Sequence, residues 1–182
     1  MFALADILKR SMRTYVITGP SSCGKSTLIE HLRERGFLIV PEVARSVLSE
    51  GVFHPCRDPY LFQQEIAKRQ AAAEDTLRQA AGEIAFLDRG FLDQIAYCRY
   101  TCGSRIPPEV QTDAHYDGVF FLEMLPNFVA DGVRVEKGTD EALDIYRMTV
   151  EAYQKRGVPS VNIPVRPVPE RADMVLKHLD LL

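Results

Sequence analysis

The amino-acid sequence predicts an α/β fold in which a five-stranded, mostly parallel sheet is flanked by helices on both faces. Two observations lead to this fold class: short apolar runs alternate with longer segments of helical periodicity, and glycines stand where several of these segments end. Such an alternation favours parallel neighbours, because a helix carries the chain back across the sheet between successive strands. The carboxyl ends of the strands are then expected to meet at one edge, where sheets of this kind bind ligands.

The individual elements follow from the same periodicities. Strands are expected at residues 15–18, 37–40, 84–87, 119–122 and 160–163. Helices are expected at residues 26–35, 41–50, 60–81, 91–100, in a short stretch beginning at Pro107, and at 139–156 and 170–182. Thr139 is expected to cap the helix that follows it, and the proline-rich residues 164–169 are expected to form a loop.

The 182 residues, 46% of them hydrophobic, are expected to form a single domain with one core. Residues 1–12 form an N-terminal extension with apolar residues spaced as in a short amphipathic helix. Met12 is an alternative translation start, so the sequence assigns no function to this extension.

Composition narrows the classes of partner. The formal net charge of -3, from 22 basic and 25 acidic side chains, argues against non-specific nucleic-acid binding and favours a small-molecule or protein partner. No apolar run approaches the roughly 20 residues of a membrane-spanning helix, and no signal peptide is recognisable, so a cytoplasmic location without membrane insertion is expected.

A glycine-rich segment, GPSSCGKS, begins at Gly19 and ends at Ser26. It follows an apolar strand and precedes a helical pattern, so it occupies a strand-to-helix turn. Glycines allow successive N–H groups to point into one concavity and to bind phosphate oxygens at the helix N-terminus. The sequence therefore predicts a phosphate-binding loop, the P-loop, and a nucleotide-binding protein. The expected nucleotide-binding residues of this loop are Gly19, Pro20, Ser21, Ser22, Cys23, Gly24, Lys25, Ser26 and Thr27.

Two side chains of the P-loop have separate expected roles. Lys25 is expected to bridge the β- and γ-phosphates, and Ser26 is expected to offer its hydroxyl to Mg²⁺. The absence of an NKxD-like guanine-reading motif favours ATP as the nucleotide, with GTP as the alternative.

Acidic residues directly follow several of the expected strands. Asp88 ends an apolar strand and is expected to be the acid on the metal side, with helix capping as the alternative role. Glu42 follows the second strand and is the expected general base for an acceptor hydroxyl; the alternative is a helix first-turn glutamate. Glu123 is expected at the same edge of the sheet.

Arginines are candidates for holding phosphate groups, with surface ion pairs as the alternative. Arg45 and Arg89 lie near the expected strand ends. Residues 125–138 lack a clean periodicity and are expected to form a lid that closes with Arg134, while Arg147 on the next helix is a second candidate for the nucleotide.

Aromatic side chains are candidates for stacking on a nucleotide base, although a place in the core is the commoner role. The candidates are Phe53, Phe62, Tyr97 and Tyr100.

Six segments together resemble a known family. They are GPSSCGKST at 19–27, PEVAR at 41–45, LDRGFLDQIAY at 87–97, YDGVFFLE at 116–123, DGVRVE at 131–136 and PVPER at 167–171. The chain resembles small P-loop AAA-type ATPases and kinases related to nicotinamide riboside kinases and, more distantly, to deoxynucleoside and thymidylate kinases. The resemblance implies a kinase-like three-layer sandwich, an adenine pocket near the loop after the last strand, a lid with Arg134, Glu42 on the acceptor side, and Asp88 with Arg89 at the third strand's end. The chain lacks the adenylyltransferase domain of some nicotinamide riboside kinases, and residues 51–59 match no acceptor pattern.

The sequence thus supports two hypotheses. In the first, the protein is a Mg-ATP-dependent kinase for a small hydroxylated acceptor, which is a nucleoside, a nucleotide or a vitamin-like metabolite. In the second, it is an ATPase or GTPase switch that acts on a protein partner. The sequence does not decide between a monomer and a homo-oligomer.

Overall fold

The structure, a computed structural model, describes residues 12–126 and 138–182. Its five strands form one sheet in the order β2-β3-β1-β4-β5, and every pair of neighbours is parallel. The strands are β1 Arg13–Thr18, β2 Leu38–Val40, β3 Ile84–Asp88, β4 Gly118–Leu122 and β5 Ser160–Ile163. The predicted five-stranded, mostly parallel sheet is therefore confirmed.

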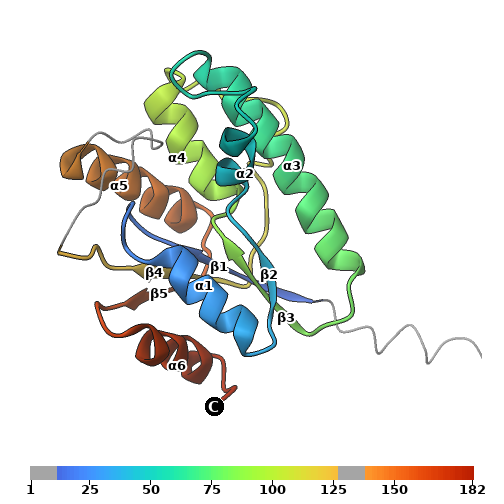
Figure 1. Ribbon diagram of the computed structural model, residues 1–182, viewed down its shortest axis with the longest axis vertical. Helices are drawn as coiled ribbons and strands as arrows, with labels where there is room; N and C mark the ends of the chain where they lie inside the picture. Colours follow the sequence, from blue (N-terminus) through green and yellow to red (C-terminus); the bar gives the residue numbers. More distant parts are fainter. Residues whose placement is uncertain (1–11, 127–137) are drawn as a thin grey trace, which may run out of the picture.

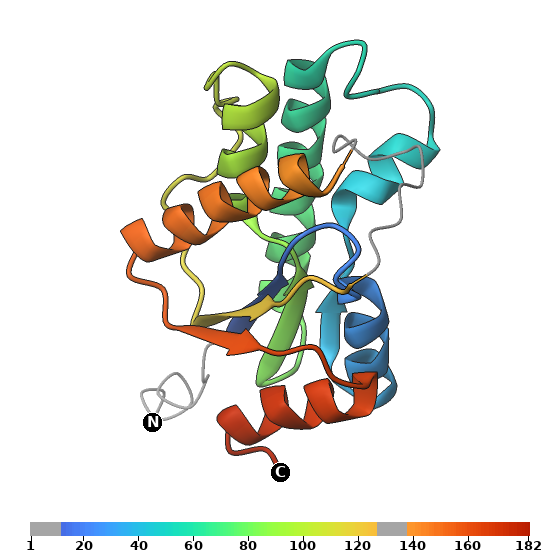
Figure 2. The same cartoon turned by 90° about the vertical axis from the view of Figure 1, so that its left-hand side faces the viewer.

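Helices cover both faces of this sheet (Figures 1 and 2). The helices are α1 Lys25–Glu34, α2 Val43–Ser49, α3 Pro59–Gln79, α4 Phe91–Thr101, α5 Thr139–Lys155 and α6 Val168–His178. One face is covered by α1 and α6, and the other by α3, α4 and α5, while α2 packs on α3. None of the helices in the described residues is both long and apolar enough to cross a membrane.

The central strand β1 shows why both faces are apolar. Tyr15 and Ile17 point into the core beneath α1 and α6, whereas Val16 between them points into the core beneath α3, α4 and α5. Successive side chains of a strand alternate between faces, so a strand buried on both sides becomes a continuous apolar run. Because β1 lies at the middle of the sheet, the turn that follows it sits at the point where the strand order reverses.

Two local predictions were wrong. Residues 107–110 form only a turn, closed by a hydrogen bond from the Val110 amide to the Pro107 carbonyl (3.0 Å), because no apolar periodicity follows to support a helix. Thr139 is the first residue of α5, and Gly138 occupies the capping position. The acidic residues Asp140 and Glu141 lie in the first turn, where the helix dipole favours them.

Helix α6 begins two residues earlier than expected and ends at His178. Pro169 lies inside its first turn, where the missing N–H of proline costs no intrahelical hydrogen bond. The possible helix in residues 1–11 and most of the expected lid lie outside the described residues.

Candidate functional site

The P-loop joins β1 to α1, as predicted, and two of its glycines occupy positions that no other residue fits. Gly19 has φ 153°, and a Cβ there would stand 2.6 Å from the Leu122 carbonyl oxygen of β4. Gly24 has φ 80°, and a Cβ there would stand 2.8 Å from the guanidinium of Arg171 on α6. The loop backbone is therefore clamped between two other elements, which fixes its shape before a ligand arrives.

Lys25 is the first residue of α1, and its ammonium group lies over the loop. Its Nζ donates hydrogen bonds to the carbonyl oxygens of Gly19 (3.1 Å) and Pro20 (2.8 Å). The side chain is almost fully buried yet lines the cavity described below. A cation is thus fixed beside the N-terminus of α1, which itself favours anions.

Ser26 and Asp88 lie side by side beneath the loop. The Ser26 hydroxyl donates to Asp88 Oδ2 (3.2 Å), and Asp88 Oδ1 is buried without a hydrogen-bond partner among the described residues. An unpartnered carboxylate oxygen next to a hydroxyl is a donor set that suits a hard cation such as Mg²⁺. Asp88 does not cap α4, because Gly90 takes that position.

Glu42 faces Asp88 across the site, and the two carboxyl groups differ in acidity. Burial raises the pKa of Asp88, and the neighbouring charge of Glu42 raises it further, to about 6. Burial also tends to raise the pKa of Glu42, but Arg89, Lys25 and Arg45 together outweigh it and lower that pKa. Glu42 is therefore ionised at neutral pH. Its carboxylate accepts from Arg45 Nε (3.0 Å) and Arg89 Nε (3.4 Å) instead of capping α2.

Arg89 has a left-handed backbone, with φ 71°, which costs a residue with a side chain about 1–3 kcal/mol. Asp93 holds it there from the first turn of α4. This carboxylate is 1% exposed, contacts Arg89 Nη1 (3.4 Å), and accepts from the Gly90 amide (3.0 Å), the Tyr153 hydroxyl (2.7 Å) and the Thr18 hydroxyl. Asp93 was not among the site residues expected from the sequence, although an acid three residues after a helix cap is a recognisable signal.

These side chains border one cavity of about 830 Å³ that extends from the P-loop to α2, α3 and α4. At the loop end the lining is charged; at the other end it is apolar, aromatic or amide. The charged residues are Lys25, Glu42, Arg45, Asp88, Arg89 and Asp93. The residues of the other end include Val43, Leu48, Phe62, Gln63, Ile66, Gln70, Gln94 and Tyr97.

Gln94 lines the cavity with a buried amide group and was not among the site residues expected from the sequence. In the part of the chain that the structure describes, both its amide oxygen and its amide nitrogen are buried without a hydrogen-bond partner. Its spacing of three from Tyr97 places the two side chains on the same face of α4. The Arg89 guanidinium lies 5.1 Å from the centre of the Tyr97 ring. Of the aromatic candidates, Phe62 and Tyr97 line the cavity, whereas Phe53 packs against α2 and α3.

Other candidates lie elsewhere. Arg134 is outside the described residues, and of the expected lid only Leu125 and Pro126 are seen lining the cavity. The Arg147 side chain is 73% exposed and pairs with Asp144 at 2.7 Å.

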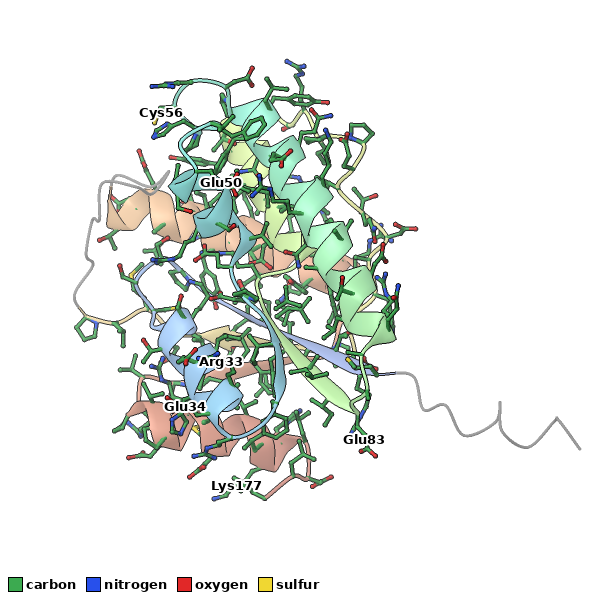
Figure 3. All side chains as sticks on the ribbon, turned by 45° about the vertical axis from the view of Figure 1, so that its right-hand side comes forward. Arg33, Glu34, Glu50, Cys56, Glu83 and Lys177 are labelled. Atoms are coloured by element: carbon green, nitrogen blue, oxygen red, sulfur yellow. The ribbon has the colours of Figure 1, made fainter. Side chains whose placement is uncertain are left out.

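Glu123 follows β4 as expected but does not line the cavity. It accepts a long hydrogen bond from the Val165 amide (3.4 Å) after β5. Figure 3 shows a further carboxylate, Glu50, at the end of α2, far from Arg33 and Glu34 of α1. Glu50 pairs with Arg69 of α3 (2.7 Å) and takes no part in the cavity lining.

The fold and this site define an α/β protein with a P-loop at the carboxyl edge of a parallel sheet. A family model described as an AAA domain matches residues 14–171, and the chain belongs to that family. The resemblance drawn from the sequence segments is therefore confirmed.

Two solved structures share the fold. The NadR protein, solved in complex with NR, has a TM-score of 0.75 and 15% identity over 94% of this chain, which spans only 52% of the NadR chain. Deoxyadenosine kinase from M. mycoides, solved with the products dCMP and dCDP, has a TM-score of 0.63 and 14% identity, covering 93% of this chain and 100% of that one. No curated protein matches the chain significantly. The family and the P-loop support a nucleotide-binding protein, and these two likenesses show that the fold is shared.

Proposed function

We propose that the protein is a Mg-ATP-dependent phosphotransferase that moves the γ-phosphoryl group to a hydroxyl of a small acceptor. The observation that carries this proposal is one continuous cavity, which joins the P-loop to the Glu42 and Arg89 pair and is also lined by neutral, partly aromatic side chains. Such a cavity has room for both a triphosphate and an acceptor of nucleoside size.

The proposed step is an in-line displacement. The acceptor oxygen forms a bond to the γ-phosphorus as the bond to the leaving oxygen of ADP breaks, and the hydroxyl proton passes to the Glu42 carboxylate. Lys25 and Arg89 offset negative charge on the phosphoryl oxygens, and Asp93 holds Arg89 in place. Mg²⁺ held by Ser26 and Asp88 would supply further positive charge. Arg134 and Arg147 are proposed to add to this charge from the lid side.

A nucleoside-like acceptor agrees with the neutral half of the cavity. Phe62 and Tyr97 offer aromatic surface, and Gln94 offers an unpaired amide donor and acceptor. The two structures of similar fold, with NR and with dCMP and dCDP, support the same class of acceptor. The switch alternative has less support, because a cavity lined by aromatic and amide side chains suits a small molecule rather than the surface of a protein partner.

The test is a screen for ADP release from ATP with nucleosides, nucleoside monophosphates and vitamin-like ribosides, each compared with water as acceptor. Lys25→Ala should abolish both triphosphate binding and turnover while the protein stays folded, because the ammonium hydrogen-bonds, among the described residues, to atoms of the P-loop itself: the Gly19 and Pro20 carbonyl oxygens and the Cys23 sulfur. Lys177→Ala, an exposed lysine of α6 (Figure 3), is the matched control and should behave as wild type. If no acceptor raises ADP release above the water background, the kinase proposal is wrong.

A further inference from the structure

Arg171, in the first turns of α6, lies behind the P-loop and outside the cavity lining. Its Nη1 donates to the Cys23 carbonyl (2.8 Å), and a Cβ on Gly24 would stand 2.8 Å from its Nη2. The residue is only 3% exposed. The guanidinium is therefore packed against the backbone of the loop and is not among the residues that line the cavity.

This buried charge has no counter-charge in the described residues. No carboxylate there pairs with Arg171, and its Nε is buried without a hydrogen-bond partner. Burial lowers the pKa of the guanidinium, which shows that the charged form is poorly solvated. An unpaired buried cation costs free energy of folding. A phosphate group on the opposite side of the loop would offset part of that cost.

We propose that Arg171 is a positioning residue for the nucleotide, one that braces the P-loop through the Cys23 carbonyl and adds a fixed positive charge behind the phosphates. The inference rests on the proposed nucleotide site but does not depend on phosphoryl transfer. It also accounts for Gly24, since any side chain at that position would displace the guanidinium. The stability of the free protein and its affinity for the nucleotide are therefore coupled. The buried charge of Arg171 lowers the free energy of unfolding of the free protein, and a bound triphosphate offsets part of that loss.

A purely structural role for Arg171, as a link between α1 and α6, makes a different forecast. Arg35 provides the comparison, because it joins the same two helices through a 2.6 Å ion pair with Asp173. Arg35 has a carboxylate partner and lies at the far end of α1 from the loop. Arg35→Met therefore serves as a control: it weakens the link between these two helices but leaves the charge next to the P-loop unchanged.

The experiment measures the affinity of the purified protein for ADP and for a non-hydrolysable ATP analogue by calorimetry, with thermal unfolding as a second readout. Arg171→Met removes the charge and the donors but keeps the apolar stem, and Arg171→Lys keeps the charge. Arg171→Met is expected to weaken binding by about tenfold. This is the loss expected when the attraction between two unit charges roughly 10 Å apart is removed at an effective dielectric constant of about 20. Arg171→Lys should lose less, and Arg35→Met should bind as wild type.

Thermal unfolding separates the two roles. The proposal expects Arg171→Met to shrink the rise in Tm that the nucleotide causes, whereas a structural role lowers the Tm of the free protein and leaves that rise unchanged. Should Arg171→Met not fold, Arg171→Gln, which keeps a donor for the Cys23 carbonyl, takes its place. A folded neutral variant whose affinity stays within about twofold of wild type overturns the proposal, as does an equal loss in Arg171→Lys. If the wild-type protein binds no nucleotide, the proposed nucleotide site itself is refuted.

Discussion

Two carboxylates that face each other in the cavity differ in the charges that surround them. Glu42 lies among three cations, and its pKa is lowered although the group is buried. Asp88 is buried next to the charge of Glu42, so its pKa rises to about 6. Its Oδ1 has no hydrogen-bond partner among the described residues. Glu42 is therefore expected to stay ionised near the acceptor, whereas the ionised form of Asp88 is the one that a bound cation would stabilise most.

Glu42→Gln is the substitution that tests the proposed base. The amide keeps the size of the side chain but accepts no proton, so kcat should fall by about 10²–10⁴-fold. ATP affinity should change little, since Glu42 binds the arginines rather than the loop. Steady-state kinetics and nucleotide titration together measure both effects. Glu50→Gln, at the other end of α2, is the control and should retain wild-type kcat. Retention of wild-type kcat in Glu42→Gln would remove the base from the mechanism.

Gln94→Leu tests the acceptor half of the cavity. Leucine fills a similar volume without the two unpaired amide atoms, so the folded protein should be at least as stable as wild type. The KM of the acceptor should rise by about tenfold or more, because the acceptor loses two hydrogen bonds to the Gln94 amide. The KM of ATP should stay constant, because this amide is not expected to contact ATP. Gln154→Leu, an exposed site on α5, serves as the control. An unchanged acceptor KM would show that the amide does not contact the acceptor.

At the scale of elements, a buried carboxylate joins α3 to the start of α4. Glu74 of α3 accepts from the Gln70 amide (2.8 Å) and the Tyr116 hydroxyl (3.0 Å), and that hydroxyl accepts from the Phe91 amide (2.9 Å). Burial is the main cause that raises the pKa of Glu74. A carboxyl group whose pKa is raised on folding binds more protons when folded, so its contribution to stability is lost as the pH rises through the folded pKa.

Glu74→Gln should therefore stabilise the protein at neutral pH, by on the order of 1 kcal/mol, because the amide keeps a hydrogen-bond acceptor but carries no charge. The gain should vanish at about pH 3, below the unfolded pKa, where the wild-type carboxyl is protonated in both states. Chemical denaturation at the two pH values measures the difference. Asp75→Asn, an exposed neighbour that also pairs with Arg78, should show no such gain. Destabilisation of Glu74→Gln at neutral pH would mean that the carboxylate charge is needed.

At the scale of the whole molecule, the proposed ligand contacts elements from both halves of the chain. ATP with Mg²⁺ should raise Tm more than ATP with a chelator, because the cation adds binding free energy to the folded state alone. Asp88→Asn should remove most of this difference but retain the rise that ATP causes by itself. Scanning fluorimetry measures all four conditions. A difference that persists in Asp88→Asn would place the cation elsewhere.

Much of the architecture was predictable, because strand and helix periodicities and the glycine-rich loop are local signals. Lys25 and Ser26 follow from the loop itself, and Glu42 and Asp88 follow from their places after apolar strands. The strand order and the place of Gln94 were not predictable, since they depend on which distant elements pack together. Residues 107–110 show the reverse case, in which a proline pair that suggests a helix start forms only a turn.

The central position of β1 also determines when the site forms as the chain is synthesised. β1 ends at Thr18, but its two neighbours in the sheet, β3 and β4, are complete only once the chain has been synthesised past Asp88 and Leu122. The Leu122 carbonyl that confines Gly19 comes with β4, and the bond to the Cys23 carbonyl comes with α6. A nascent chain therefore carries the complete P-loop sequence long before the loop takes its folded shape, and nucleotide binding is expected to begin only after α6 has been synthesised and has docked.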